Sequence, residues 1–171
     1  MKKLVCALSF LLFAACSDGD LQIETIDFDS VAVDNCGDLN DEITTLFKIN
    51  GDEALILTLQ SGVLQKGIVG DTVVTTVSTI PGQSKLVYRI FSENVSNNYF
   101  CDEIPPVSPV VTEEIDAEDG MVIIETTVNA DSTAFDHVIK LSEITLVNDA
   151  GERITDLTIN DFGEISTPID N

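Results

Sequence analysis

Apolar and polar residues alternate over short segments along most of the chain, with a period of two residues rather than the 3.6 of a helix. Val, Ile and Thr are common in these segments, and β-branched side chains favour strands over helices. The pattern therefore predicts a series of short β-strands separated by turns. The candidate strands are residues 21–33, 43–49, 54–59, 71–80, 85–91, 121–128, 137–147 and 154–159, with a last apolar group at Phe162 and Ile165.

Turn residues separate these segments. An Asn-Gly pair at 50–51 predicts a tight hairpin, and the Pro-Gly pair at 81–82 predicts another turn. Three prolines within residues 104–111 exclude a central strand or a helix there. The alternation changes phase near residues 142–143, which indicates a bulge or a bend in that strand.

Many short strands with turns between them, and no sustained helical period, predict an all-β fold. The expected architecture is an antiparallel β-sandwich, for which an immunoglobulin-like fold is one option, and an open barrel is the alternative. Residues 21–167 are expected to form a single domain, followed by a tail at 168–171. The chain has eight Phe and no Trp, so its core must be mainly aliphatic.

The first fifteen residues follow a different pattern. Lys2 and Lys3 precede an apolar run over residues 4–15 that only Ser9 interrupts, and the run ends in two alanines. A basic start, a short apolar run and small residues before the cleavage site are typical of a secretory signal peptide. The run is shorter than the roughly 20 residues of a transmembrane helix. Residues 1–15 are therefore predicted to be a signal peptide that is removed.

The end of this leader, Phe13-Ala14-Ala15-Cys16, resembles a bacterial lipobox, with Phe13 where Leu is usual. The resemblance implies that Cys16 becomes the mature N-terminus and carries a diacylglyceryl group on its thiol. Each buried CH₂ contributes about 0.8 kcal/mol, so two or more chains give a stable anchor. Residues 16–20 would then be the lipid-anchor cysteine and an acidic tether. Ordinary cleavage before Cys16 is the alternative.

Ser17-Asp18-Gly19-Asp20 resembles the short acidic export tract that follows the lipidated cysteine in surface lipoproteins of the Bacteroidota, although a solvated linker is an equal alternative. The whole chain resembles small uncharacterised lipoproteins of the flavobacterial type, through CSDGDLQIETIDFDSV at 16–31 and GERITDLTINDFG at 151–163. The resemblance implies a protein that is secreted through the inner membrane and lipid-anchored in the outer membrane or on the cell surface. It implies no mechanism.

The chain is strongly acidic. Its net charge is −22, and loss of Lys2 and Lys3 with the leader leaves six basic and 30 acidic residues, a charge of −24. This balance excludes nonspecific nucleic-acid binding, which depends on Lys and Arg neutralising phosphates. It favours solubility and low nonspecific association. The expected partner is the membrane, through the N-terminal lipid, and cationic or metal partners stay open against a generic acidic surface.

The four cysteines separate by position. Cys6 lies in the leader and Cys16 is the lipidation candidate, so Cys36 and Cys101 form the one pair in the mature domain. In an oxidising compartment such a pair predicts a disulfide. Closing a loop of about 65 residues would contribute roughly 4 kcal/mol at most in the chain-entropy model. Two free thiols are the alternative.

No group of residues indicates catalysis. A hydrolase triad needs a base, and His137 is the only histidine; it follows Asp136 at the start of an apolar strand and is predicted to be half-exposed at the strand end. The 30 acidic residues single out no carboxylate pair for glycoside hydrolysis, and no Trp is available to stack on a sugar. We expect no enzyme activity, no catalytic residue and no cofactor.

Two acidic segments are candidates for calcium. Calcium takes six to eight oxygen ligands, and neither segment has the spacing of an EF-hand loop. Solvated acidic surface is the favoured interpretation of both, and no metal ligand is assigned. The segments contain Asp34, Asp38 and Asp41 in one case, and Glu113, Glu114, Asp116, Glu118 and Asp119 in the other.

The sequence thus predicts a lipid-anchored cell-envelope protein whose acidic, disulfide-bonded β domain is a non-enzymatic binding or structural module. The alternative is a calcium- or carbohydrate-binding accessory lipoprotein of a nutrient-uptake system.

Overall fold

The computed structural model describes residues 26–39, 42–64, 67–70, 72–148, 151, 153–154 and 161–169. Nine strands form one antiparallel sheet, which confirms the predicted all-β class. The strands are β1 (Asp34–Asn35), β2 (Thr44–Asn50), β3 (Glu53–Leu59), β4 (Val74–Ile80), β5 (Ser84–Phe91), β6 (Val111–Val128), β7 (Ala134–Val147), β8 (Arg153–Ile154) and β9 (Asp161–Pro168), and one short helix, α1 (Asn97–Cys101), follows β5.

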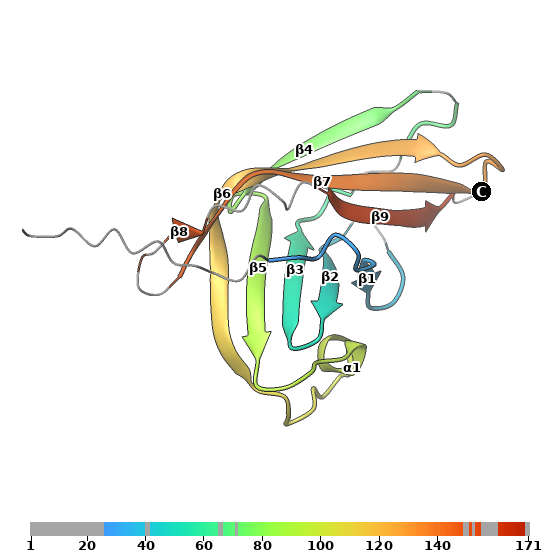
Figure 1. Cartoon of the computed structure of the whole chain (residues 1–171). Helices are drawn as coiled ribbons and strands as arrows, with labels where there is room; N and C mark the ends of the chain where they lie inside the picture. Colours follow the sequence, from blue (N-terminus) through green and yellow to red (C-terminus); the bar gives the residue numbers. More distant parts are fainter. Residues whose placement is uncertain are drawn as a thin grey trace, which may run out of the picture.

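The sheet has two halves that share β6. The first part of β6 pairs with β5 through residues 111–116, and its second part pairs with β4 through residues 120–126. One half has the order β1-β2-β3-β5-β6 and continues through the end of β7 to β8, and the other has the order β4-β6-β7-β9. Figure 1 shows β6 bending so that the second half lies across the first. Hydrogen bonds join all nine strands into one sheet, so the structure does not divide into two separate sheets. The predicted sandwich of two sheets therefore stays a prediction.

Several predicted elements are confirmed. The β2–β3 hairpin turns through Gly51 and Asp52, with Gly51 at a φ of 65° that favours glycine. The phase change near residues 142–143 is a bulge: Asp119 pairs with Thr145 but Met121 pairs with Ser142, and Glu143 has a φ of 57°. At the end of the described chain, β9 includes Pro168, one residue beyond the predicted domain boundary.

Three secondary-structure predictions are wrong. Residues 21–33 were expected to be a strand, but residues 26–33, the part of it that the structure describes, contain none, and β1 begins at Asp34. Residues 113–119 lie outside every predicted strand, but they belong to β6, which runs unbroken for 18 residues. The solvent-facing acids of this segment alternate with buried Ile115 and Ala117, so it has a strand pattern that high charge conceals. No helix was expected after residue 91, whereas α1 begins at Asn97.

The main core lies between the two halves. Leu46, Leu57 and Leu86 from the first half and Ile124 and Ile139 from the second have no exposed surface. Burying an aliphatic side chain of this size contributes about 1.5–3 kcal/mol, so the closing of one half over the other carries most of the fold's apolar burial. The core is aliphatic, as the absence of Trp predicts.

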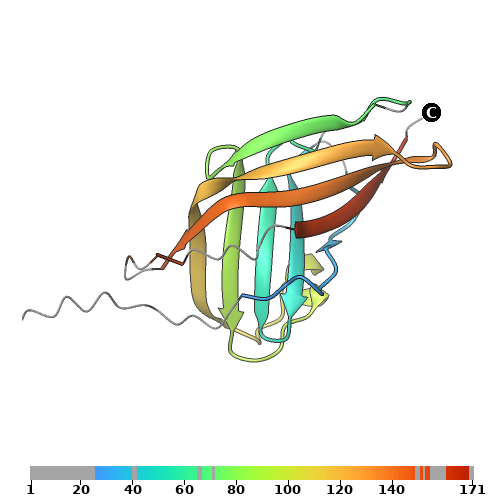
Figure 2. The ribbon, with the colours of Figure 1, turned by 45° about the horizontal axis from the view of Figure 1, so that its top comes forward.

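The segment that precedes β1 closes this core on one side. Ile26 and Phe28 are buried in it, and Phe28 meets the edge of the Tyr88 ring with 6.4 Å between centroids. Asn50 Nδ2 donates to the Asp27 carbonyl at 3.0 Å. Figure 2 shows the segment crossing the strands of the first half.

A smaller apolar cluster lies on the opposite face of β2, β3 and β5. Phe47, Ile56 and Phe91 form it, and α1 covers it with Tyr99 and Phe100. Phe100 stacks on Phe47 with 4.5 Å between ring centroids, and Tyr99 meets Phe91 edge-on at 4.9 Å. In the described residues no helix is both long and apolar enough to cross a bilayer.

Candidate functional site

The predicted lipidation site, Cys16, lies outside the described residues, as do Phe13 and the tether at 17–20. Lipidation of Cys16 therefore stays a prediction.

The predicted disulfide between Cys36 and Cys101 is present. It joins the residue after β1 to the last residue of α1, with 5.2 Å between the two Cα atoms. Because β1 pairs only with residues 46–47 of β2, the bond ties this short strand to a helix that packs on the first half of the sheet. The disulfide is thus a structural element that fixes both ends of the loop it closes.

The first calcium candidate is partly used within the fold. The Asp34 carboxylate accepts hydrogen bonds from its neighbour's amide, Asn35 N at 2.8 Å, and from Asn97 Nδ2 of α1. This carboxylate therefore links β1 to α1, beside the disulfide. Asp38 is described, whereas Asp41 lies outside the described residues, so the three acids cannot be compared as one group.

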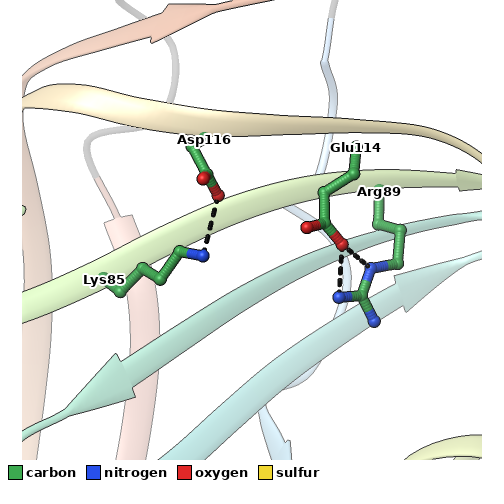
Figure 3. Close-up of polar contacts among 4 residues, drawn as sticks. All are labelled: Lys85, Arg89, Glu114 and Asp116. Atoms are coloured by element: carbon green, nitrogen blue, oxygen red, sulfur yellow. Dashed lines mark hydrogen bonds and ion pairs between the residues drawn. The ribbon is translucent and has the colours of Figure 1, made fainter.

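The second candidate faces solvent on β6. Glu114 and Asp116 project toward two basic side chains of the adjacent β5 (Figure 3). Arg89 Nε donates to Glu114 Oε2 at 2.7 Å, and Lys85 Nζ lies 3.1 Å from Asp116 Oδ1. Exposed pairs of this kind contribute about 0–1 kcal/mol each. They neutralise part of the acidic segment without stabilising the fold much.

An acidic groove runs along this face. It has a volume of about 720 Å³ and is lined by Val111, Thr112, Glu113, Glu114, Asp116, Glu118, Val147 and Asn148. A second hollow of about 480 Å³ continues past Asp116 and Glu118 to Lys85 and Pro81. Carboxylates are thus concentrated at one open surface where a cationic group could bind. In the part of the chain that the structure describes, no three His, Cys, Asp or Glu side chains are grouped closely enough to hold a metal ion.

His137 does not lie where the sequence predicts. It is fully buried in β7, and the prediction of a half-exposed side chain is wrong. Its Nδ1 lies 2.8 Å from Thr126 Oγ1 of β6, and its Nε2 lies 2.9 Å from Thr167 Oγ1 of β9. Burial lowers the pKa of His137, against a weaker opposite effect of Asp136. A neutral imidazole between two hydroxyls is a satisfied core residue that joins three strands.

Lys48 is a buried basic residue that the sequence analysis did not single out. It lies on the core side of β2, 2 % exposed, with Nζ 5.8 Å from the centre of the Phe162 ring. Burial lowers the pKa of Lys48, while the carboxylates of Asp161, Asp29 and Asp27 act in the opposite direction. A cation above an aromatic face is stabilised by the ring quadrupole. The alternation on β2 could have indicated that Lys48 shares a face with Leu46, but not that this face is covered.

The structure therefore brings together the two cysteines, but it places the acidic groove, His137 and Lys48 in three separate environments. Comparison of the chain with protein-family models, curated proteins and solved structures found no match.

Proposed function

We propose that the protein is a lipid-anchored component of the cell envelope, in the outer membrane or on the cell surface, whose β domain is a non-enzymatic binding or structural module. The observation that carries this proposal is the leader, in which an apolar run and a small pair lead directly to Cys16. The lipobox resemblance assigns the anchor to that residue.

The domain that follows has properties suited to that location. A disulfide such as Cys36–Cys101 is maintained in oxidising compartments and is rare in the cytosol. The acidic surface supports solubility beside an anionic membrane, because like charges keep the domain away from the lipid headgroups. A single covalent anchor would then be the attachment to the membrane.

The test is metabolic labelling with palmitate in a bacterial host that lipidates exported proteins. The wild-type chain is expected to take up label and to fractionate with membranes. Cys16→Ala is expected to lose both properties, because it removes the thiol that would carry the lipid. Cys6→Ala is the matched control: it changes a cysteine of the leader and should keep the label.

Absence of label from the wild-type chain, or equal labelling of wild type and Cys16→Ala, would show that the anchor proposal is wrong. Membrane fractionation without label would indicate that the protein is held by another protein instead.

The acidic groove on β6 is the feature on which the alternative function, calcium binding in an accessory lipoprotein of nutrient uptake, would depend, although in the described residues no three of its acidic side chains are grouped closely enough to hold a metal ion. Its lining contains Glu113, Glu114, Asp116 and Glu118, and hard cations prefer such oxygen ligands. This alternative requires calcium to stabilise the domain by more than the screening that any salt provides. No comparable feature favours a carbohydrate, since the chain has no Trp.

A further inference from the structure

The second half of the sheet has two outer strands of very different composition. In the order β4-β6-β7-β9, both β4 and β9 pair with one neighbour in the described part of the chain. β9 contains Asp161, Glu164 and Pro168, residue types that protect an edge against pairing with another chain. β4 has the sequence VTTVSTI and contains no charged residue and no proline.

The surface of β4 is also unusually apolar for this protein. Val77 is 53 % exposed and Val73, just before the strand, is 55 % exposed. Figures 1 and 2 both show β4 at the border of its half of the sheet, with no strand beyond it. An unpaired strand edge with β-branched residues and no charge is a site at which another strand can add.

The neighbouring surface is electrically neutral as well. On β6 the residues opposite Thr79 and Val77 are Met121 and Ile123, and the acid opposite Thr75 is Glu125. Glu125 Oε2 lies 2.8 Å from Lys140 Nζ, so its charge is compensated. On a chain with 30 acidic residues, this is a surface where two copies could approach without strong repulsion.

The order of residues in β4 suits pairing with itself. Outward from Val77 in both directions, Thr76 is matched by Ser78, Thr75 by Thr79, and Val74 by Ile80. An antiparallel pair of β4 strands about a two-fold axis at Val77 would therefore place hydroxyl beside hydroxyl and aliphatic beside aliphatic. Such cross-strand pairs contribute roughly 0.2–1 kcal/mol each.

We propose that β4 is a dimerisation edge at which two copies of this chain pair antiparallel, with Val77 of each copy facing Val77 of the other. The interface is isologous, so one edge serves both copies and the assembly closes as a dimer. The dimer extends the four-stranded half of each copy into one continuous sheet. The proposal does not depend on the lipid anchor or on the acidic groove.

Cysteine cross-linking tests the register directly. Residues facing each other across antiparallel strands have Cα atoms about 4.5–5.5 Å apart, within the range of a disulfide. Val77→Cys in the whole chain, produced with its leader and mildly oxidised, should give a dimer on a non-reducing gel. Val107→Cys is the control, because Val107 is 93 % exposed in the segment between α1 and β6 and lies outside the proposed interface.

Equal dimer yields from the two variants, or no dimer from Val77→Cys, would overturn the proposal. Capture of Val77→Cys in a species whose mass does not equal two copies would also overturn it, in favour of a strand from another protein.

A second measurement uses charge instead of a bond. Sedimentation of the whole protein in nonionic detergent should give the mass of two copies for the wild type and for Val107→Lys. Val77→Lys should sediment as one copy, because it places two ammonium groups against each other at the axis. A wild type that is monomeric at all concentrations, or a Val77→Lys variant that stays dimeric, would contradict the proposal. The melting curve of each variant verifies that it is folded.

Discussion

His137 shows how one buried residue can make the fold sensitive to pH. Each ring nitrogen faces one threonine hydroxyl, and the imidazole has no exposed surface. A hydroxyl can either donate or accept, so the neutral ring is fully satisfied whichever nitrogen carries its proton. The protonated ring would place a charge in the core, which is why burial lowers its pKa.

We therefore expect the free energy of unfolding to fall as the pH drops below the ordinary pKa of a histidine. The pKa of His137 is lower in the folded chain than in the unfolded chain, so the unfolded chain binds the proton first. The contribution of His137 to the free energy of unfolding is present above about pH 6.5. At pH 5.5 the loss of this contribution is at most about 1.4 kcal/mol. Urea unfolding at pH 7.5 and 5.5 measures this loss.

His137→Gln is the control, because it keeps a polar side chain at this position but does not titrate. Its free energy of unfolding should change less over the same interval than that of the wild type. An identical fall in the two proteins would assign the pH dependence to carboxylates and contradict the role of His137.

At the same scale, the sequence predicted the disulfide, but it did not predict the surroundings of single buried side chains. The Cys36–Cys101 bond could be predicted because Cys6 lies in the predicted leader and Cys16 is the lipidation candidate, which leaves only these two cysteines. The environments of His137 and Lys48 could not, because each depends on strands that are distant in the sequence: the Thr167 hydroxyl lies 2.9 Å from His137 Nε2, and Phe162 lies near Lys48. Alternation places a residue on a face, but only the paired strands decide whether that face is covered.

At the scale of elements, the bend in β6 depends on Gly120. Its φ is +137°, and a Cβ at this position would lie 2.5 Å from Ile144 Cδ1 and 3.1 Å from the Ser142 carbonyl oxygen. The bend lets one strand pair first with β5 and then with β4, which folds one half of the sheet over the other. Glycine is required here by both conformation and space.

Gly120→Ala is therefore expected to lower the free energy of unfolding by at least about 2 kcal/mol, through backbone strain and overpacking together. Gly62→Ala is the matched control, because Gly62 has a φ of +80° but no atom within 4 Å of the added Cβ. Urea unfolding of the two variants separates strain from crowding. Equal losses would show that the bend does not depend on the lack of a side chain at Gly120.

The elements themselves were predictable where side chains of opposite character alternate. The second part of β6 and β7 follow that pattern in their burial, whereas β2, β3 and β5 were predictable as short apolar segments next to turn residues. The first part of β6 was missed because exposed acids outnumber its inward apolar residues, Ile115 and Ala117. α1 was missed because five residues contain too few turns to show a helical period. The order of strands in the sheet could not be predicted, since it follows from the bend.

At the scale of the whole molecule, charge acts against compactness. The chain has 30 acidic and eight basic residues, and two of the basic residues lie in the predicted leader. Lys85, Arg89 and Lys140 each form an ion pair with an acidic residue, while Lys48 is buried. The acidic surface must therefore repel itself, and folding brings these charges closer together than in the unfolded chain.

Monovalent salt should consequently stabilise the domain. Raising NaCl from about 0.01 M to about 0.15 M shortens the screening length from about 30 Å to about 8 Å and should raise the free energy of unfolding by on the order of 1 kcal/mol. Urea unfolding over the salt series measures this. An unchanged or falling free energy would show that self-repulsion does not limit stability.

Calcium at matched ionic strength then separates screening from a site. If the groove on β6 binds calcium, CaCl₂ should raise the melting temperature beyond NaCl in a saturable way, because a ligand of the folded state stabilises it by mass action. Asp116→Asn combined with Glu118→Gln should remove that excess, whereas Asp131→Asn combined with Glu103→Gln removes the same charge elsewhere and should keep it. If the CaCl₂ and NaCl curves coincide, the groove is acidic surface that any cation screens, and the calcium-binding alternative is wrong.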